Sequence, residues 1–364
     1  MKTDYRDRVL DPVLEKAWQG ERLSLDEGTS LYQADWMLLG KVADHRRRKV
    51  FPGRDEVVTF AINRNLNYTN ICYVGCDFCA YYRKPDNPDA YLLSREEIFV
   101  KLDELQALGG TEVLLQGGLH YKLGLDYYLE LFHAIREQYP GLYIHSLSVS
   151  EIYHLCRKSG FPLDEVLRQL KQAGLRSIPG AAELLVDRVR EIVSPNKVTA
   201  AQWLDCMETA HGLGIESTAT MTFGMVETLA ERIEHMDKIR SLQEKTHGFR
   251  AFISWTFSPW NTQLSHLKPV GGVDYLRTVA ISRLYLDNIP HITSGYVTEG
   301  MKLAQVALSF GCDDMGGTLM QEEVVAATGT GTPSTNLSTL IESIRGAGKI
   351  PAQRDSEYHI LRRF

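Results

Sequence analysis

Three cysteines lie within eight positions of this 364-residue sequence, in the stretch NYTNICYVGCDFCAYYRK. Their spacing is Cys72-x3-Cys76-x2-Cys79. The thiolate is the form of cysteine that binds metals and attacks disulfides, so three thiols this close together predict a metal centre or a redox site. The other three cysteines of the chain are scattered, and we expect them to be buried and inert.

Three kinds of chemistry use thiols at such short spacing. A structural zinc site takes four ligands in a closed tetrahedron, and neither His45 nor His120 lies in a second ligand motif. A thioredoxin-like pair would use Cys76 and Cys79 and leave Cys72 without a role. A [4Fe–4S] cluster normally takes four cysteines, so three of them leave one iron open for a substrate or cofactor. We favour the cluster, with zinc and thiol redox chemistry as alternatives.

Regular alternation of strand-like and helical segments predicts the scaffold that positions this motif. Consecutive parallel strands joined by helices are βαβ units, and eight of them in this length favour a (β/α)8 TIM-type barrel, with a doubly wound open sheet as the alternative. Active sites of such barrels collect at the carboxyl ends of the strands. The eight strand-like segments are 56–63, 111–118, 142–148, 175–180, 215–224, 249–257, 290–295 and 310–317.

The rest of the chain surrounds this predicted barrel. We expect an N-terminal helical extension over 1–52, the barrel over 53–320, and a C-terminal helical segment and tail over 321–364 that pack on the barrel. Ser24 followed by Glu27 is a capping-box pattern that predicts the start of a helix in the extension.

Composition and charge narrow the class of protein. With 44% hydrophobic residues, 24% charged residues and a formal net charge of −6, the chain lacks the basic balance of a nucleic-acid-binding protein. We interpret the basic run 45–49 as a solvated helix end. No apolar run approaches the roughly 20 residues of a membrane helix, and the N-terminus does not read as a signal peptide. We therefore expect a cytoplasmic protein without nucleic-acid or membrane partners.

The cysteine motif resembles that of the radical S-adenosylmethionine (SAM) superfamily. The aromatic Phe78 before the last cysteine and the LLQGG sequence at the end of the second predicted strand are similar to further motifs of that superfamily. The resemblance implies a [4Fe–4S] cluster and SAM as cofactors, with the open iron chelating the amino and carboxylate groups of SAM. One electron then cleaves SAM and gives a 5′-deoxyadenosyl radical.

Several longer stretches resemble one branch of this superfamily, among them IPGAAELLVDRVREIVSPNK, ATMTFGMVET and DDMGGTLMQEEVV. That branch contains the deazaflavin-forming synthases and two enzyme families of the futalosine route to menaquinone. The terminal GKIPAQRDSEYHILRRF is most similar to the dehypoxanthine futalosine cyclases. This implies that dehypoxanthine futalosine is the small-molecule substrate and that a flavodoxin or ferredoxin is the electron donor. Alternatives are aminofutalosine synthase, a deazaflavin synthase subunit, a non-enzymatic metal scaffold or a thiol oxidoreductase.

The resemblance also implies cofactor contacts. The backbone at Phe78 would face the adenine, the Gly-rich turn would receive the amino group of SAM, and Glu183 would hold the ribose hydroxyls. In the Gly-rich turn this chain has Gln-Gly-Gly where the superfamily more often has Gly-Gly-acid, which leaves a side-chain contact open. Two of these contacts have a structural alternative. For the glycines the alternative is a tight turn, and for Glu183 it is a contact with a helix dipole. The full predicted set is Phe78, Tyr81, Gln116, Gly117, Gly118, Ser148, Glu183 and Thr220.

Four polar side chains near predicted strand ends are candidate catalytic residues: His145, His291, Asp313 and Asp314. They would hold polar substrate groups or accept a proton. Because side chains alternate along a strand, we expect at most one of the two adjacent acids to face the pocket. A satisfied core histidine and helix capping by Asp are the structural alternatives. Arg354 in the tail is a further candidate, for a carboxylate of the substrate.

Overall fold

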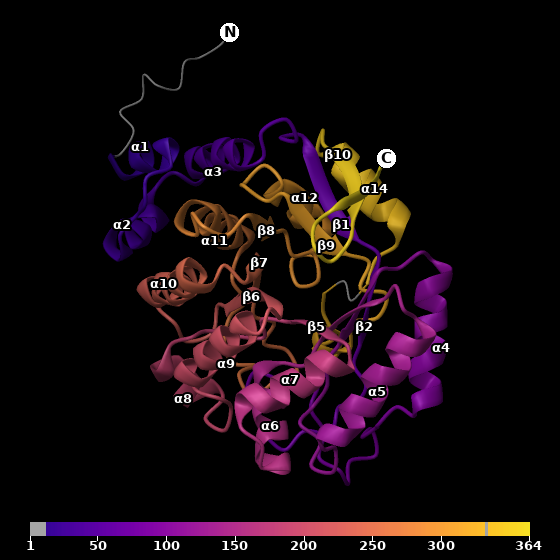
Figure 1. Ribbon diagram of the computed structural model, residues 1–364. Coiled ribbons are helices and arrows are strands. Elements are labelled where there is room, and N and C mark those ends of the chain that lie inside the picture. The colour runs from indigo at the N-terminus through magenta and orange to yellow at the C-terminus, as the bar shows by residue number, and fades with distance from the viewer. Residues whose placement is uncertain (1–11, 332–333) are drawn as a thin grey trace.

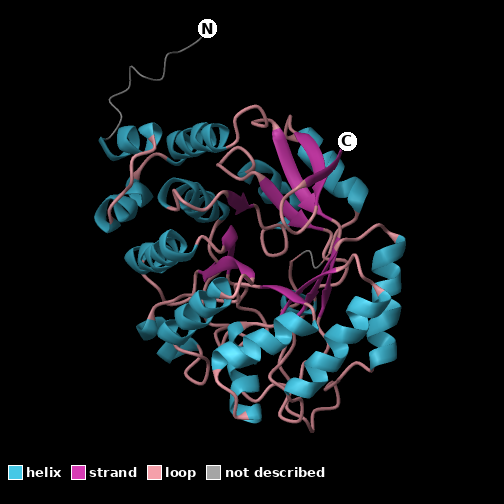
Figure 2. Ribbon diagram, in the orientation of Figure 1, coloured by secondary structure: helices cyan, strands magenta, loops and turns pink. Residues whose placement is uncertain are grey.

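The computed structural model describes residues 12–331 and 334–364, which form one curled, largely parallel sheet wrapped by helices (Figure 2). All eight predicted strand segments contain a strand. In chain order the strands are β1 (Val57–Ala61), β2 (Asn63–Leu66), β3 (Glu112–Leu115), β4 (Tyr143–Ser146), β5 (Leu175–Ile178), β6 (Glu216–Phe223), β7 (Phe249–Thr256), β8 (His291–Thr293), β9 (Asp314–Gly317), β10 (Ile350–Arg354) and β11 (Ile360–Arg363).

The first predicted strand closes the barrel. It is split at Ile62 into β1 and β2, of which β1 pairs in parallel with β9 and β2 pairs in parallel with β3. From β3 to β9 each strand pairs in parallel with the next. The two ends of the sheet therefore meet on one strand, and the predicted (β/α)8 barrel is confirmed.

Helices connect successive strands and cover the outside of the barrel (Figure 1). Ser148 caps the helix after β4 and forms a capping box with Glu151. The same device begins three other crossover helices. The crossover helices are α4 (Arg95–Ala107), α5 (Leu125–Gln138), α6 (Val149–Ser159), α7 (Leu163–Ala173), α8 (Asp187–Val193), α9 (Ala200–Gly212), α10 (Leu229–Thr246), α11 (Gly272–Tyr285) and α12 (Gly300–Ala307).

The described part of the predicted N-terminal extension is helical, and residues 1–11 of that prediction lie outside the described residues. It packs on the outside of the barrel, α2 against α10 and α3 against α11. Gly40 permits the close approach of α3, because a Cβ there would lie 2.6 Å from the ring of Phe310. The basic run 45–49 ends α3, but it is not simply solvated: Arg47 is fully buried and pairs with Asp44 at 2.9 Å. The elements are α1 (Pro12–Gln19), α2 (Leu25–Ser30), the 3-10 helix η2 (Leu31–Gln33) and α3 (Trp36–Val50).

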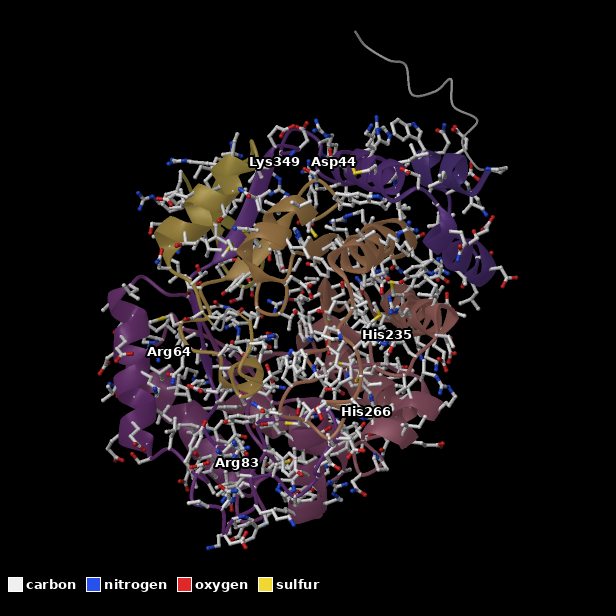
Figure 3. The ribbon with its side chains drawn as sticks, turned by 180° about the vertical axis from the view of Figure 1, so that it is seen from behind. Asp44, Arg64, Arg83, His235, His266 and Lys349 are labelled. Carbon is white, nitrogen blue, oxygen red and sulfur yellow. The ribbon has the colours of Figure 1, made fainter. Side chains whose placement is uncertain are left out.

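The C-terminal segment contains helices α13 (Glu323–Ala326) and α14 (Leu337–Gly346), followed by a β-hairpin that the sequence analysis did not predict. Strand β10 pairs in parallel with the first half of the first barrel strand, and β11 pairs antiparallel with β10. Figure 3 shows Lys349, just before β10, at one end of the molecule and Arg83, in the loop after β2, at the other. Within the described residues, no helix is both long and apolar enough to cross a bilayer.

Candidate functional site

The three clustered cysteines lie in the long loop between β2 and α4, at the carboxyl end of the first barrel strand. Cys76 is buried, Cys72 and Cys79 are partly exposed, and all three are free thiols. Backbone hydrogen bonds fix the loop: the Cys72 amide donates to Arg83 O (3.1 Å), and the Cys79 amide donates to Cys76 O (3.1 Å). The predicted position at an active-site end of the barrel therefore agrees with the fold.

The environment of these thiols opposes three separate thiolates. Burial, with smaller contributions from Glu183, Cys79 and Cys72, raises the pKa of Cys76 to about 12 against the effect of Lys197. Burial also raises the pKa of Cys79, and Cys72 adds to the effect. Thiolates in such a place need a bound cation that binds them as ligands and compensates their charge. The loop is therefore chemically suited to a metal centre.

The spacing of the sulfur atoms distinguishes two kinds of metal centre. A tetrahedral zinc ion with bonds of about 2.3 Å brings its thiolates to within about 4 Å of one another. In the part of the chain that the structure describes, the three cysteines do not form a group whose ligand atoms all lie within 4.8 Å of one another. The wider arrangement favours a larger cluster over a single zinc ion.

The Gly-rich turn after β3 packs directly on the cysteine loop. A Cβ on Gly118 would lie 2.4 Å from Ile71 O and 2.9 Å from the Cβ of Cys72, and a Cβ on Gly117 would lie 2.8 Å from the Tyr68 ring. Only glycine fits at such distances, so close packing accounts for both glycines of this turn. The Gly118 amide donates to Thr69 O (2.9 Å) and the Gly117 amide donates to a buried carboxylate. Both amides of this turn therefore already have acceptors. A bound ammonium group, which can only donate, would have to donate to carbonyl oxygens here.

That carboxylate belongs to Glu151, which links the Gly-rich turn to the predicted Ser148. Glu151 Oε1 accepts from the Gly117 amide (3.1 Å) and from the Tyr68 hydroxyl (2.7 Å), while Oε2 accepts from the Ser148 hydroxyl (2.7 Å). Burial raises the pKa of Glu151 above its ordinary value, against the effect of these hydrogen bonds. Ser148 thus supports the turn as part of a helix cap.

Glu183 follows β5 and faces the cysteine loop from the other side. Its Oε1 accepts from Lys197 Nζ at 2.6 Å, whereas its buried Oε2 has no hydrogen-bond partner and lies 3.8 Å from the Arg190 guanidinium as an ion pair. Lys197 also lies over the ring of Phe78, 5.6 Å from the centroid. Both Glu183 and Ala181 have positive φ angles, +47° and +41°, a conformation that costs non-glycine residues energy and is often found at functional sites. A buried carboxylate oxygen that accepts no hydrogen bond within the protein is suited to accept one from a ligand hydroxyl.

The remaining predicted cofactor residues have internal partners. The Thr220 hydroxyl accepts from the Ala182 amide (3.1 Å) and so supports the backbone next to Glu183. Tyr81 is buried, and its hydroxyl bonds the Tyr91 hydroxyl at 2.6 Å, which makes it part of the loop's own packing. Around the cysteines the structure therefore brings together Phe78, the Gly-rich turn and Glu183, with Ser148 and Thr220 behind them.

Comparison with known proteins identifies this arrangement. Residues 66–239 match the family model of the "Radical SAM superfamily", and residues 246–363 match that of the "CofH/MqnC C-terminal region". A cyclic dehypoxanthine futalosine synthase of Halalkalibacterium halodurans is 43% identical to it, over 98% of this chain and 96% of that protein. The chain belongs to the CofH/MqnC family of radical SAM enzymes.

Other CofH/MqnC-type enzymes are nearly as similar. An aminodeoxyfutalosine synthase of Thermus thermophilus is 39% identical over 98% of this chain and 97% of that protein. Among solved structures, methylornithine synthase (PylB) superimposes with a TM-score of 0.74 over 93% of this chain and 97% of that chain. Its identity is 16%, so this likeness concerns the fold alone.

Membership of the radical SAM superfamily implies a [4Fe–4S] cluster and SAM, and the residues of this radical SAM enzyme fit both. Three free thiols, spaced more widely than zinc requires, lie at the carboxyl end of the barrel. The Glu183 carboxylate lies close enough for its charge to act on Cys76, and its Oε2, which accepts no hydrogen bond within the chain, offers an acceptor for a polar cofactor. Lys197, which pairs with Glu183, was missed because no local sequence pattern marks it.

Three of the four predicted catalytic residues lie at the wrong end of the barrel. Asp314 and His291 are the first residues of β9 and β8, and Asp313 precedes β9, so the prediction that they lie at the carboxyl rim is wrong. The two acids do point in different directions. The buried Asp313 carboxylate accepts from the Arg283 guanidinium through Oδ1, and its Oδ2 lies 2.6 Å from His291 Nδ1. Burial opposes its ionisation, but the contacts with His291 and Arg283 outweigh burial and lower the pKa of Asp313.

Asp314 points instead toward the C-terminal tail and pairs with Arg354. The Arg354 Nε donates to Asp314 Oδ2 at 2.6 Å, and both side chains are buried. The prediction that Arg354 meets a substrate carboxylate is therefore replaced by this internal pair. His145, in the middle of β4, bonds the Ser177 hydroxyl at 2.6 Å, and burial lowers its pKa to about 4. Its nearest charges are Glu112, Arg250 and Arg354, so it too belongs to this buried polar group.

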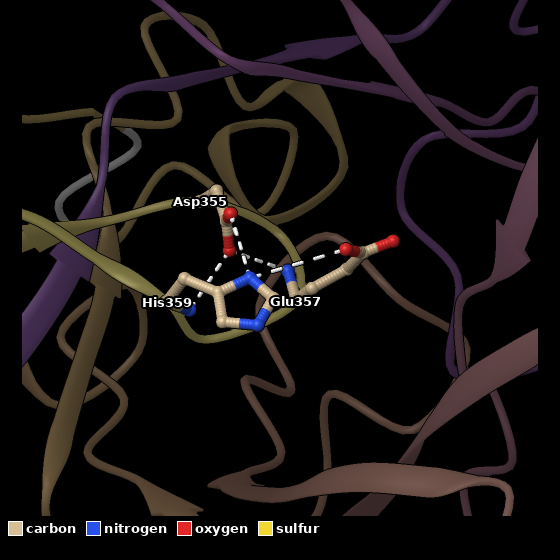
Figure 4. A group of neighbouring side chains, drawn as sticks. All are labelled: Asp355, Glu357 and His359. Carbon is tan, nitrogen blue, oxygen red and sulfur yellow. Dashed lines mark hydrogen bonds and ion pairs between the residues drawn. The ribbon is translucent and has the colours of Figure 1, made fainter.

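The tail covers the amino end of the barrel, beside a cavity of about 960 Å³ lined by the first residues of several strands and by residues 357–359. Figure 4 shows three side chains of this turn, Asp355, Glu357 and His359, close together. Asp355 Oδ1 accepts from the amides of Glu357 and His359, both at 2.9 Å, and its Oδ2 bonds the imidazole of His359. These hydrogen bonds account for the group as the organiser of a tight turn.

Two polar residues near the barrel's interior were missed by the sequence analysis. Asn65 on β2 lies in register with Leu114 and, one strand further, with His145, and its buried Oδ1 has no hydrogen-bond partner. Glu322 follows β9, and burial raises its pKa to about 7 although its carboxylate accepts from the Val324 and Val325 amides. A carboxyl group with a pKa near neutrality is suited to exchange protons. Asn65 lies outside the motifs singled out from the sequence, and Glu322 lies in the DDMGGTLMQEEVV stretch without having been singled out there.

Proposed function

We propose that this radical SAM enzyme converts dehypoxanthine futalosine into cyclic dehypoxanthinyl futalosine in menaquinone biosynthesis. The observation that carries the proposal is the 43% identity, over nearly the full length of both chains, to a relative of that name. The free thiols in the loop after β2 support the radical chemistry that such a cyclisation requires. We also propose a cytoplasmic location, where six free cysteines remain reduced.

In this proposal the chain's residues hold and orient two cofactors. Cys72, Cys76 and Cys79 would hold the cluster, which together with SAM would supply the one-electron chemistry for removing a hydrogen from the substrate ribose. The backbone at Phe78 would face the adenine, and the Oε2 of Glu183, which accepts no hydrogen bond within the chain, would accept from the ribose hydroxyls of SAM. Lys197 positions Glu183 through their 2.6 Å contact.

The barrel must also exclude water and hold the target C–H bond close, because a primary carbon radical reacts with most C–H bonds. We assign Asn65 to a polar group of the substrate, since its buried Oδ1 otherwise lacks a partner. We assign Glu322 to the proton released when the ring closes, because its pKa of about 7 allows it to accept one near neutral pH. Replacing Glu322 by Gln should then slow product formation more than it slows SAM cleavage.

The test is an anaerobic reaction of the reconstituted protein with SAM, a reductant and dehypoxanthine futalosine. Mass spectrometry should find 5′-deoxyadenosine together with a product that is lighter than the substrate by two hydrogens. Deoxyadenosine without this product would retain the radical chemistry and refute the substrate. Cys72→Ala should abolish SAM cleavage and lower the iron content, whereas a thiol oxidoreductase that uses Cys76 and Cys79 would keep its activity.

A second candidate is aminodeoxyfutalosine synthesis, because a relative of that name is 39% identical over almost the whole chain. The same assay separates the two proposals when it is supplied with the substrate of that reaction. A product from that substrate, and none from dehypoxanthine futalosine, would assign the chain to the second activity.

A further inference from the structure

A basic and aromatic surface lies directly beside the cysteine loop. We call it the Tyr73 face, after the residue that follows Cys72. Tyr73 and Tyr121 are 50% and 46% exposed, which is unusual for large aromatic side chains without a ligand. The Tyr73 amide donates to Leu119 O (3.4 Å), so the cysteine loop and the loop after β3 form one continuous surface. The face consists of Tyr73, Tyr121, Lys122, Arg157 and Lys158.

Hydrogen bonds hold the Tyr73 face together. The Arg157 guanidinium donates to the Tyr73 hydroxyl at 2.8 Å, and this hydroxyl also contacts His154 Nδ1 at 3.1 Å. His154 Nε2 contacts Leu123 O, so Nε2 carries the proton and Nδ1 accepts from the Tyr73 hydroxyl. Lys158 Nζ donates to Tyr121 O at 2.8 Å. The ring of Tyr73, although exposed, is therefore fixed in orientation.

Positive charges dominate the electrostatic surroundings of the two histidines next to this face. Burial lowers the pKa of His120, and the charges that lower it further are Lys122 and Lys158, with His154. Burial likewise lowers the pKa of His154, and the charges that act on it are Lys158 and Arg157. No carboxylate is among the groups that shift either histidine. On a chain with a formal charge of −6, the face is a local positive patch.

The opposite side of the cysteine loop has a different character. A hollow of about 750 Å³ lies there, and its charged lining residues are Arg83, Lys84, Asp86 and Asp89. The charges of the two cations and two anions cancel, so this side has no net charge. A partner that is attracted by charge would therefore approach the cysteines from the Tyr73 face.

We propose that the Tyr73 face binds a small acidic protein that carries single electrons, such as a flavodoxin. This inference rests on the proposed radical SAM function, for which it names the electron-transfer partner. One electron passes from the reduced carrier to the cluster held by Cys72, so the carrier is oxidised and the cluster is reduced by one electron, without proton transfer. Exposed, fixed tyrosines surrounded by cations provide the contact area and the steering charge that such a transient complex needs.

The test measures binding and reduction separately, on the cluster-loaded protein. Calorimetric titration with oxidised flavodoxin should give a Kd that weakens as salt is added. The double variant Arg157→Glu, Lys158→Glu should weaken this Kd at low salt by about tenfold or more, because like charges then face each other. The matched control Lys84→Glu, on the mixed side of the same loop, should change the Kd less than about twofold.

Reduction provides the second measurement. The double variant should lose most of its SAM cleavage with reduced flavodoxin but keep the wild-type rate with dithionite, which needs no docking surface. An unchanged Kd in the double variant, or an equal loss in Lys84→Glu, would overturn the proposal. Failure of the wild-type protein to cleave SAM with dithionite would instead refute the radical SAM function, while the binding titration would still report on the Tyr73 face.

Discussion

Replacing Arg354 by Met should destabilise this radical SAM enzyme by about 3–5 kcal/mol, because it removes one partner of a buried ion pair. The Arg354 Nε and Nη2 donate to Asp314 at 2.6 and 3.1 Å, and the Asp314 side chain is 0% exposed. Burial lowers the pKa of Arg354, but the charge of Asp314 outweighs it and raises this pKa above the ordinary value. The guanidinium is therefore charged in the folded protein.

The size of the effect follows from what remains around Asp314. Its carboxylate keeps three uncharged donors, the hydroxyls of Thr59 (2.7 Å) and Thr293 (3.2 Å) and the Gly316 amide (2.8 Å). These bonds do not compensate a full charge out of water, so most of the cost of its burial appears as lost stability. An exposed pair provides the contrast. Arg168 and Asp164 are in contact at 2.7 Å, each nearly half exposed, and Arg168→Met should cost about 0–1 kcal/mol.

Urea unfolding followed by far-UV circular dichroism measures both changes. Arg354→Met, Asp314→Asn and the double variant together give the coupling free energy of the pair, with Arg168→Met as the surface control. The double variant should cost less than the sum of the single variants, because removing both partners leaves no unpaired charge. The reasoning is refuted if Arg354→Met costs no more than Arg168→Met. A raised KM for the substrate at unchanged stability would return Arg354 to the role first predicted for it.

Three further predictions concern the cysteine end and the interior. Gly118→Ala should lower the iron content and the stability, because the added Cβ would lie 2.4 Å from Ile71 O and must displace the cysteine loop. Glu183→Gln should weaken SAM binding by about 10- to 100-fold, the effect of one lost charged hydrogen bond, as measured by equilibrium dialysis on cluster-loaded protein. The free energy of unfolding should fall by about 2 kcal/mol between pH 7 and pH 5 through His145 alone, because the unfolded histidine binds a proton in that range and the folded one, with a pKa of about 4, does not. His145→Gln should remove this part of the pH dependence.

Each of these predictions has a matched control. Gly141→Ala adds a Cβ into open space and should leave iron content unchanged. Glu191→Gln, on the exposed side of α8, should leave SAM affinity unchanged, and exposed His133→Gln should leave the pH slope of stability unchanged. Equal effects in a control and its test variant would contradict the role assigned to the tested residue.

The cysteine motif and the barrel could be predicted from the sequence because both depend on local patterns. Cys72, Cys76 and Cys79 are close in the chain and need only one loop to bring them together. The alternation of strands and helices reflects burial along each segment, and the eight predicted strand segments were confirmed. The β10–β11 hairpin was missed because its residues owe their strand conformation to pairing with β1, more than 280 positions away.

The roles of the charged residues were decided only by the tertiary structure. Asp313, Asp314 and His291 were assigned to the rim because they lie near the ends of predicted strands, but boundaries of a few residues decide which end of a strand a side chain occupies. Asp314 and Arg354 are 40 residues apart and meet only when the tail folds under the barrel. The sequence by itself determined which chemistry this protein can hold, because the ligands of its metal centre are neighbours in the chain. Which carboxylates and cations surround that centre, and which stabilise the opposite end, depends on long-range packing that no local pattern records.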